Sequence, residues 1–296
     1  ALWDGSRWSA LAAGLSRGQV NALVIDNEGI LHAGGGFGNS GTTTLRRIGR
    51  WDGETWSSLG GGFVLGSVND MTLSAEGDLY VAGSTNAAIN SDGTQVSGGS
   101  MFKWDGSEWS TLTDPNVTQG YAGIGGEVNT ILIDDSGGVY AGGRFRSASG
   151  KTVNNVAYWN GETWSDLGGG VDGQVFSLAL NDEGLVVSGS FSSAGNIVAD
   201  GMARWNGSEW TPFANENPDA LALAYGPDGR LYAGGYFSGE LVSRWTGTEW
   251  EGLGSGPPSV TTMQFDPRGY LYVGGSFSAI DGVEANGVAR WDGLVE

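Results

Sequence analysis

Cysteine is absent from this chain of 296 residues, and histidine occurs once, as His32. Without cysteine there is no disulfide framework, no thiol nucleophile and no thiolate metal site. A single histidine excludes a histidine-rich metal centre and leaves a Ser-His-Asp triad only one candidate base. No apolar run approaches the roughly 18 residues that a membrane-spanning helix requires, so we expect no membrane insertion.

Basic residues are also scarce. Lys and Arg number 14 against 33 Asp and Glu, which gives a formal net charge of −19, and the only lysines are Lys103 and Lys151. Binding to phosphate backbones requires a basic surface, so this composition excludes nucleic acid as a partner. The chain also begins inside a repeat and carries no signal peptide, so we expect a domain excised from a larger protein, monomeric in isolation.

Tryptophan and glycine are abundant instead, and both recur at fixed positions. All 13 tryptophans belong to one motif, which reads "LWDGSRWSAL", "RWDGETWSSL", "KWDGSEWSTL", "YWNGETWSDL", "RWNGSEWTPF", "RWTGTEWEGL" and, as a half copy at the end, "ARWDG". No tryptophan remains outside the repeat. We therefore interpret the paired tryptophans as part of the scaffold and not as a ligand-binding cluster.

The repeat predicts an all-β fold. Its copies are spaced by 48, 53, 55, 46, 40 and 46 residues, in the range of propellers and solenoids. Each copy contains four short strand-like runs joined by Asp-Gly or Asn-Gly turns, which are typical of tight hairpins. We predict a single domain over residues 1–296: a six-bladed β-propeller with four antiparallel strands in each blade. The C-terminal blade lacks a fourth strand, so we expect the N-terminal strand to complete it and close the ring.

The unit W-D-G-x-x-W … L-Y-A-G-G-x-F resembles the propeller repeats of large bacterial surface and secreted proteins. It is also similar to repeats of fungal Rax2-like cell-surface proteins and, more distantly, to kelch and WD40 blades. This resemblance covers essentially the whole chain. It implies a β-propeller, an extracellular or cell-surface location, and a binding or architectural role. It brings no catalytic residues, because the shared motif is the scaffold itself.

Several short motifs are explained by the repeat. His32 occupies the strand position that other copies fill with Tyr80, Tyr140, Tyr232 and Tyr272. The run "GFGNSG" (36–41) is followed by a strand and not by the helix of a dinucleotide site. The run "ASGKT" (148–152) lacks the first glycine of a phosphate loop. Acidic turns at 26–29, 134–137 and 181–184 are oxygen-rich, but none has a full calcium ligand spacing. We therefore expect no cofactor, with calcium a weak alternative.

The long insertions all fall at one end of the repeats. We call this end, with its second-to-third loops and its crossings between blades, the long-loop face, and the opposite end the short-turn face. Insertions at 86–100, 114–127, 146–155 and 278–287 make the long-loop face the predicted ligand site. A further acid lies in a first strand where other copies have small residues. The candidate ligand-binding residues are Asp70, Tyr121, Arg146, Lys151, Asp281 and Glu284.

Three functions remain open. The leading hypothesis is a non-enzymatic recognition or adhesion module that binds a glycan or a protein through the long-loop face. The alternative is a glycoside hydrolase or polysaccharide lyase, which would need two carboxyls roughly 5–10 Å apart at that face. The available acids there are Asp114, Glu127, Asp219, Asp281 and Glu284. The third is a purely structural spacer.

Overall fold

The computed structural model describes residues 1–117, 122–214, 219–237, 240–256 and 259–293. Every regular element in these residues is a β-strand, so the predicted all-β class is confirmed. Accordingly, the described residues include no helix with the length and apolarity to traverse a lipid bilayer.

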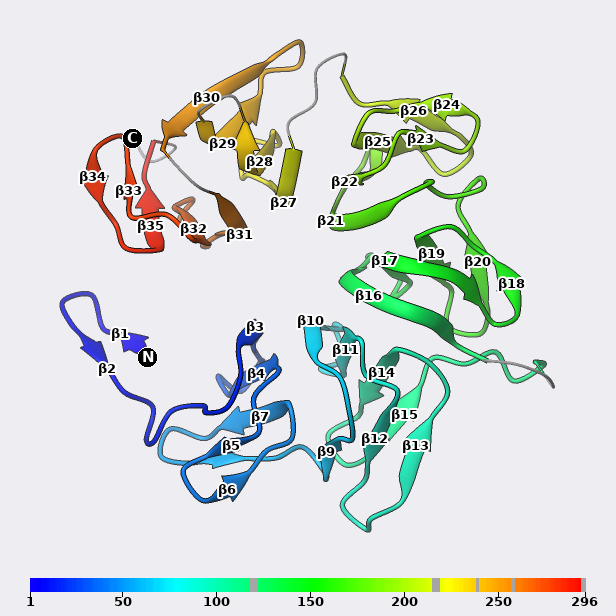
Figure 1. Ribbon diagram of the computed structural model, residues 1–296, viewed down its shortest axis with the longest axis vertical. Helices are drawn as coiled ribbons and strands as arrows, with labels where there is room; N and C mark the ends of the chain where they lie inside the picture. The colour runs from blue at the N-terminus through cyan, green and yellow to red at the C-terminus, as the bar shows by residue number, and fades with distance from the viewer. Residues whose placement is uncertain (118–121, 215–218, 238–239, 257–258, 294–296) are drawn as a thin grey trace. The chain divides into compact units, whose positions relative to one another are not determined.

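The chain divides into two compact units, one of Ala1–Val153 with Ala157–Ser165 and one of Asn154–Val156 with Asp166–Glu296. Six antiparallel sheets follow one another along the sequence, and we number them in chain order (Figure 1). Whether residues 1–296 form one domain stays a prediction.

The first unit holds the first three sheets. The first sheet runs β3 (Val20–Ile25), β4 (Leu31–Gly35), β7 (Ile48–Trp51) and β8 (Trp56–Ser57). The second runs β10 (Val68–Leu73), β11 (Leu79–Gly83), β14 (Met101–Trp104) and β15 (Trp109–Thr111). The third runs β16 (Ile124–Ile133), β17 (Val139–Ala148), β19 (Val156–Trp159) and β20 (Trp164–Asp166), with β18 (Lys151–Thr152) paired to β17.

The second unit holds the other three sheets. The fourth sheet runs β21 (Gln174–Asn181), β22 (Gly184–Ser190), β25 (Met202–Trp205) and β26 (Trp210–Pro212). The fifth runs β27 (Asp219–Tyr225), β28 (Leu231–Phe237), β29 (Glu240–Trp245) and β30 (Trp250–Ser255). The sixth has three strands in the described residues, β31 (Val260–Phe265), β32 (Leu271–Gly275) and β35 (Val288–Trp291).

Short strands form the remaining small sheets, most of them in the second-to-third loops. They are β1 (Leu2–Trp3) with β2 (Trp8–Ser9), β5 (Asn39–Ser40) with β6 (Thr43–Thr44), β9 (Gly62–Phe63) with β12 (Ala87–Ile89) and β13 (Gln95–Ser97), β23 (Ser193–Ala194) with β24 (Ile197–Val198), and β33 (Ala279–Ile280) with β34 (Val283–Glu284).

The tryptophan motif forms the third-to-fourth hairpin. Trp51 lies directly opposite Trp56, and the same register recurs in other copies. The paired indole rings lie 5.1 to 5.5 Å apart. Asp52 accepts the amide N–H groups of Glu54 and Thr55, and Gly53 takes a φ of 103°, which favours glycine. Polar chemistry at the turn and aromatic pairing across it therefore specify the same hairpin.

In four copies of the motif the second tryptophan also bonds to the end of the preceding copy. The Nε1–H of this residue donates to the carbonyl oxygen of the leucine that ends the preceding repeat. This indole hydrogen bond joins Trp56 to Leu11 at 3.2 Å, Trp109 to Leu59 at 3.1 Å, Trp164 to Leu112 at 2.9 Å and Trp210 to Leu167 at 2.5 Å. The interpretation of these tryptophans as scaffold agrees with that bonding.

The expected closure by the N-terminal strand is not confirmed. Strand β2 pairs with β1, with Trp3 opposite Trp8, and both rings are about half exposed. The N-terminal copy of the motif, "LWDGSRWSAL", thus forms its own third-to-fourth hairpin, because the first tryptophan of the motif is the natural cross-strand partner of the second.

Candidate functional site

The interface between the fourth and fifth sheets departs from the repeat. Trp250 is the copy that should donate an indole hydrogen bond to the carbonyl of residue 213, where the motif has Phe213 instead of leucine. Its Nε1–H is buried and has no hydrogen-bond partner among the described residues. The Phe213 ring instead lies 5.8 Å from Trp250 and 5.2 Å from Trp245.

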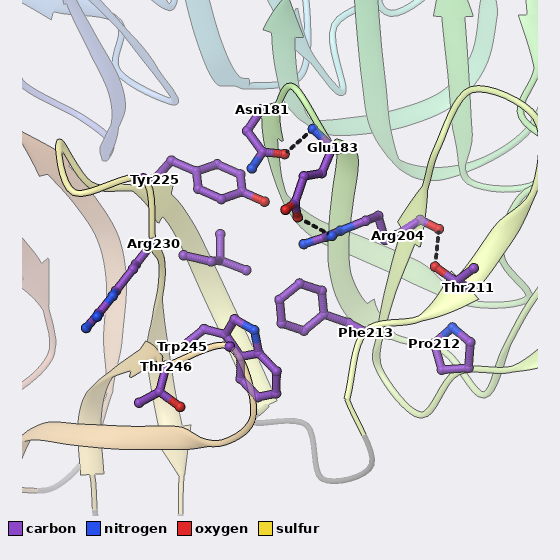
Figure 2. A pocket seen from close by; sticks show the side chains of 13 residues that line it. Asn181, Glu183, Arg204, Thr211, Pro212, Phe213, Tyr225, Arg230, Trp245 and Thr246 are labelled. Atoms are coloured by element: carbon purple, nitrogen blue, oxygen red, sulfur yellow. Dashed lines mark hydrogen bonds and ion pairs between the residues drawn. The ribbon is translucent and has the colours of Figure 1, made fainter.

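A groove of about 430 Å³ opens at this interface, within the second unit (Figure 2). Its volume is within the range of about 300–1,000 Å³ that is usual for small-ligand sites. Its lining residues come from the turns that follow β21 and β27, from the ends of β25 and β29, and from β26 with the residue that follows it. The lining residues come from both sheets, and those labelled in Figure 2 are Asn181, Glu183, Arg204, Thr211, Pro212, Phe213, Tyr225, Arg230, Trp245 and Thr246.

The groove combines an apolar bed with polar groups at one end. Leu231, which is buried, and the rings of Phe213, Trp245 and Tyr225 are among the residues that line it. The Arg204 guanidinium lies 5.2 Å from the centre of the Phe213 ring. Aromatic faces beside fixed polar groups suit the apolar faces and hydroxyls of a small polar ligand.

Two donors in the groove lack partners. Tyr225 Oη and Arg204 Nε are both buried and accept or donate no hydrogen bond within the described residues. Burial raises the pKa of Tyr225, which the nearby Arg204 charge opposes, although no hydrogen bond of normal geometry joins the two side chains. An unpartnered buried donor is costly, typically by about 1–3 kcal/mol, and such groups recur at functional sites.

The Arg204–Glu183 ion pair, by contrast, belongs to the scaffold. Arg204 Nη1 donates to Glu183 Oε2. At the same repeat position Lys103 bonds Asp78 and Tyr158 bonds Asp134. In each case a third-strand side chain bonds the first-to-second turn, so the pair itself carries no evidence of ligand binding.

Asp70 is hydrogen-bonded to the backbone of its own strand and of the next sheet. Its carboxylate oxygens accept the backbone N–H groups of Met71 and Ile131, each at 2.8 Å, and Thr130 donates from its side chain. Burial raises the pKa of Asp70 to about 6, against the effect of these hydrogen bonds. The acid therefore joins β10 to β16. Ser177 Oγ accepts the N–H of Leu223 from the equivalent position of the fourth sheet.

Arg146 and Lys151 share one hairpin, formed by β17 and β18, and both are exposed. Lys151 Nζ donates to the carbonyl oxygen of Trp164 at 3.1 Å. Tyr121 lies outside the described residues. The structure thus brings Arg146 and Lys151 onto the same hairpin, and their role in binding stays a prediction.

Asp281 and Glu284 lie on the exposed β33–β34 hairpin of the second unit. Asp281 Oδ1 accepts the backbone N–H and the hydroxyl of Ser255, and these hydrogen bonds lower its pKa. Glu284 accepts the Asn286 amide. These contacts fix the turn, and neither confirms nor contradicts the predicted ligand role.

The long-loop face carries a groove of its own in the first unit. It has a volume of about 560 Å³ and is lined by Val64, Leu65, Asn86, Ala87, Gln95, Ser97, Gly98, Thr111, Thr113 and Ala122. These side chains are uncharged, and none is aromatic. The groove therefore offers hydrogen bonding without a ring to stack on or a charge to pair with.

The acids proposed for catalysis are engaged locally where they are described. Asp114 is buried and accepts the N–H and amide of Asn116, and Glu127 accepts the Asn69 amide. The side chain of Asp219 lies outside the described part. Within the described ranges, no three His, Cys, Asp or Glu side chains are grouped to hold a metal ion.

Comparison with known proteins gives matches in structure alone. No family model matches the chain, and no curated protein matches its sequence. The WD40 β-propeller domain of Doa1 matches over 92% of this chain and 77% of its own, with a TM-score of 0.57 and 13% identity. The fold is that of a β-propeller. Its blades are the sheets described above, whereas their number and closure are not confirmed.

Two further propellers come from different functional classes. The extracellular domain of a hybrid two-component system from B. thetaiotaomicron matches 97% of this chain with a TM-score of 0.62 and 12% identity. This chain spans about a third of that protein, 35% of its length. A gluconolactonase from Xanthomonas campestris matches over 91% of this chain and 90% of its own, with a TM-score of 0.53 and 15% identity. Identities this low show the fold and leave the activity open.

Sequence reasoning missed the propeller groove in Figure 2, although two signals mark it. Tyr225 stands where the other first strands have Ile25, Leu73, Ile133, Leu180 and Phe265. Phe213 stands where the other fourth strands end in leucine. Both substitutions fall on neighbouring blades and line one groove, which the packing of β21 and β22 against β27 reveals and the sequence does not.

Proposed function

We propose that this propeller is a non-enzymatic recognition module that binds a saccharide in the groove of Figure 2. One observation carries the proposal: the sequence departs from the repeat at Phe213 and Tyr225, and at this place aromatic rings and two unpartnered donors belong to one pocket. Pyranose rings present apolar faces that stack on aromatic side chains and hydroxyls that bond polar groups. This site replaces the long-loop face as the leading candidate.

Recognition is favoured over catalysis because the carboxylates considered for catalysis already hold ion pairs or hydrogen bonds. Glu183 pairs with Arg204, and Asp281 and Glu284 bond their own hairpin neighbourhood. A glycosidase would need one carboxyl free to donate a proton beside another that attacks or activates water. We also propose an extracellular or cell-surface setting, in line with the sensor domain that shares this fold.

The test is a glycan array with the whole chain, followed by calorimetry on the best ligand. Phe213→Leu restores the residue of the other repeats, so it should fold normally and lower affinity about tenfold by removing one ring contact. Leu65→Ala, in the long-loop groove, serves as the matched control and should bind as the native chain does. Weaker binding by Leu65→Ala together with native affinity in Phe213→Leu would place the site on the long-loop face. Binding of no glycan would reject saccharide recognition.

We further propose that six blades close into one ring, with β2 beside β35. Six first strands of the same pattern, β3, β10, β16, β21, β27 and β31, support the blade count. The absence of cysteine permits spin labels on Ser9→Cys and Arg290→Cys alone. Pulsed electron resonance should then give a separation compatible with neighbouring strands, whose backbones lie about 5 Å apart. A longer distance would reject closure.

A further inference from the structure

The two unpartnered donors specify what the groove of Figure 2 lacks. Arg204 Nε–H and Tyr225 Oη–H come from adjacent blades, and Figure 2 shows the Tyr225 hydroxyl directed toward Arg204 and Glu183. One oxygen acceptor on a ligand, placed between them, would satisfy both. The first requirement of the ligand is therefore an acceptor oxygen at this end of the groove.

Charge decides which kind of acceptor fits. The Arg204 guanidinium already pairs with Glu183, whose side chain is 64% exposed beside the groove. Arg230 lies at the rim with Asp228 4.0 Å away, so each cation has an acid beside it. A carboxylate or sulfate would meet Glu183 as a like charge, which costs free energy. A neutral carbonyl oxygen accepts from both donors without that cost.

The surroundings of the donors suit the rest of an amide group. Exposed Glu183 oxygens can accept an amide N–H, and the Phe213 ring offers an apolar surface for a methyl group. A carbonyl, an N–H and a methyl together make an acetamido group.

An extended peptide would also supply amides, but the edge of the fourth sheet disfavours it. Its outer strand β26 ends in Pro212, which has no N–H to pair with an added strand. Recognition of a peptide by strand addition is thus blocked beside the groove, and a compact saccharide is favoured.

We infer that the groove selects an N-acetylated amino sugar, holding the acetamido carbonyl between Arg204 Nε and Tyr225 Oη. This inference rests on the proposed function. It predicts that the acetamido group, and not the sugar ring alone, determines which saccharides bind.

The experiment compares sugars in matched pairs that differ only at C2 of each ring: N-acetylglucosamine with glucose, N-acetylgalactosamine with galactose, and the β-1,4-linked tetramers of N-acetylglucosamine with those of glucose. Calorimetry on the whole chain should show the acetylated member of at least one pair bound about tenfold more tightly, as expected for two hydrogen bonds. The glucosamine tetramer, which lacks the acetyl group, should bind no better than the glucose tetramer.

Two conservative variants test whether Tyr225 and Arg204 cause the preference for the acetylated sugar. Tyr225→Phe removes only the hydroxyl, and Arg204→Lys removes Nε–H while keeping a charge that can pair with Glu183, as Lys103 pairs with Asp78. Each should lower affinity for the acetylated sugar about two- to tenfold and lower affinity for the plain sugar by a smaller factor, so that the preference for the acetylated sugar shrinks.

The outcomes separate the two claims. Equal binding within every pair, tighter binding of glucosamine, or an unchanged preference in both variants would overturn the acetamido inference and leave saccharide recognition standing. Array ligands that all lack the acetamido group would overturn it as well. Binding of no saccharide would overturn the proposed function itself.

Discussion

Asp70, a half-buried acid, allows a test of how blades are joined. Its carboxylate accepts N–H groups from Met71 on its own strand and from Ile131 on the next blade. Asp70→Asn removes the titration, and Asp70→Ser reproduces the contact that Ser177 makes with Leu223. Comparing the two variants separates the acid's charge from its hydrogen bonds.

The magnitude follows from the pKa of Asp70, which burial raises from 3.8 to about 6. The folded chain therefore binds a proton more tightly than the unfolded chain does between these values. Stability contributed by this group is complete below the unfolded pKa and is lost as pH rises through about 6. A shift of about 2 pKa units corresponds to about 3 kcal/mol, so ionised Asp70 should lower the free energy of unfolding by that amount at neutral pH.

The assay is urea unfolding of the native chain and both variants between pH 4 and pH 7.5. Other carboxylates also titrate in acid, but they are common to all three proteins and cancel in the differences. The stability of the native chain relative to Asp70→Asn should rise by about 2–3 kcal/mol as pH falls across this range. A pH-independent difference would refute the assignment of a buried, proton-binding carboxyl.

Two other predictions concern the tryptophans and the long-loop face. Trp164→Ala should lower the free energy of unfolding by about 3–5 kcal/mol, because the ring is fully buried and bonds Leu112, and should leave affinity in the Figure 2 groove unchanged. Denaturant melts and calorimetry on the same sample check both. Replacing Tyr121, Arg146 and Lys151 together with alanine should leave both folding and saccharide binding intact. Lost binding with an unchanged melting temperature would return the site to the long-loop face.

The fold was predictable because its signals are local. The pairing of Trp51 with Trp56 across Asp52-Gly53 is encoded within six residues, and the same code recurs in every repeat. Because the same four strand-like runs recur in successive copies, the number of strands in a blade could be predicted from the sequence without knowing any long-range contact. The partner of the N-terminal strand could not be predicted, since Trp8 can pair equally well with Trp3 or with Trp291 in the half copy "ARWDG".

The site was harder to predict because it depends on contacts between repeats. Asp70 stood out among small residues, and its two hydrogen bonds to backbone N–H groups could not be predicted from any residue pattern, while its predicted ligand role stays a prediction. Tyr225 and Phe213 were visible as departures from the repeat. Their meaning emerges only from the unpaired Trp250 and the groove between two blades.

The indole hydrogen bonds also have an order in time. Each one runs backward along the chain, from a tryptophan to a carbonyl 43 to 52 residues earlier. A ribosome that adds about 5–20 residues per second makes that span in roughly 2–10 seconds. The acceptor has therefore already emerged whenever its donor arrives, and each blade can lock onto the one made before it. Within the described residues Trp250 lacks this bond, so the fifth sheet meets the fourth without the indole contact that the earlier sheets have to lock them to their predecessors.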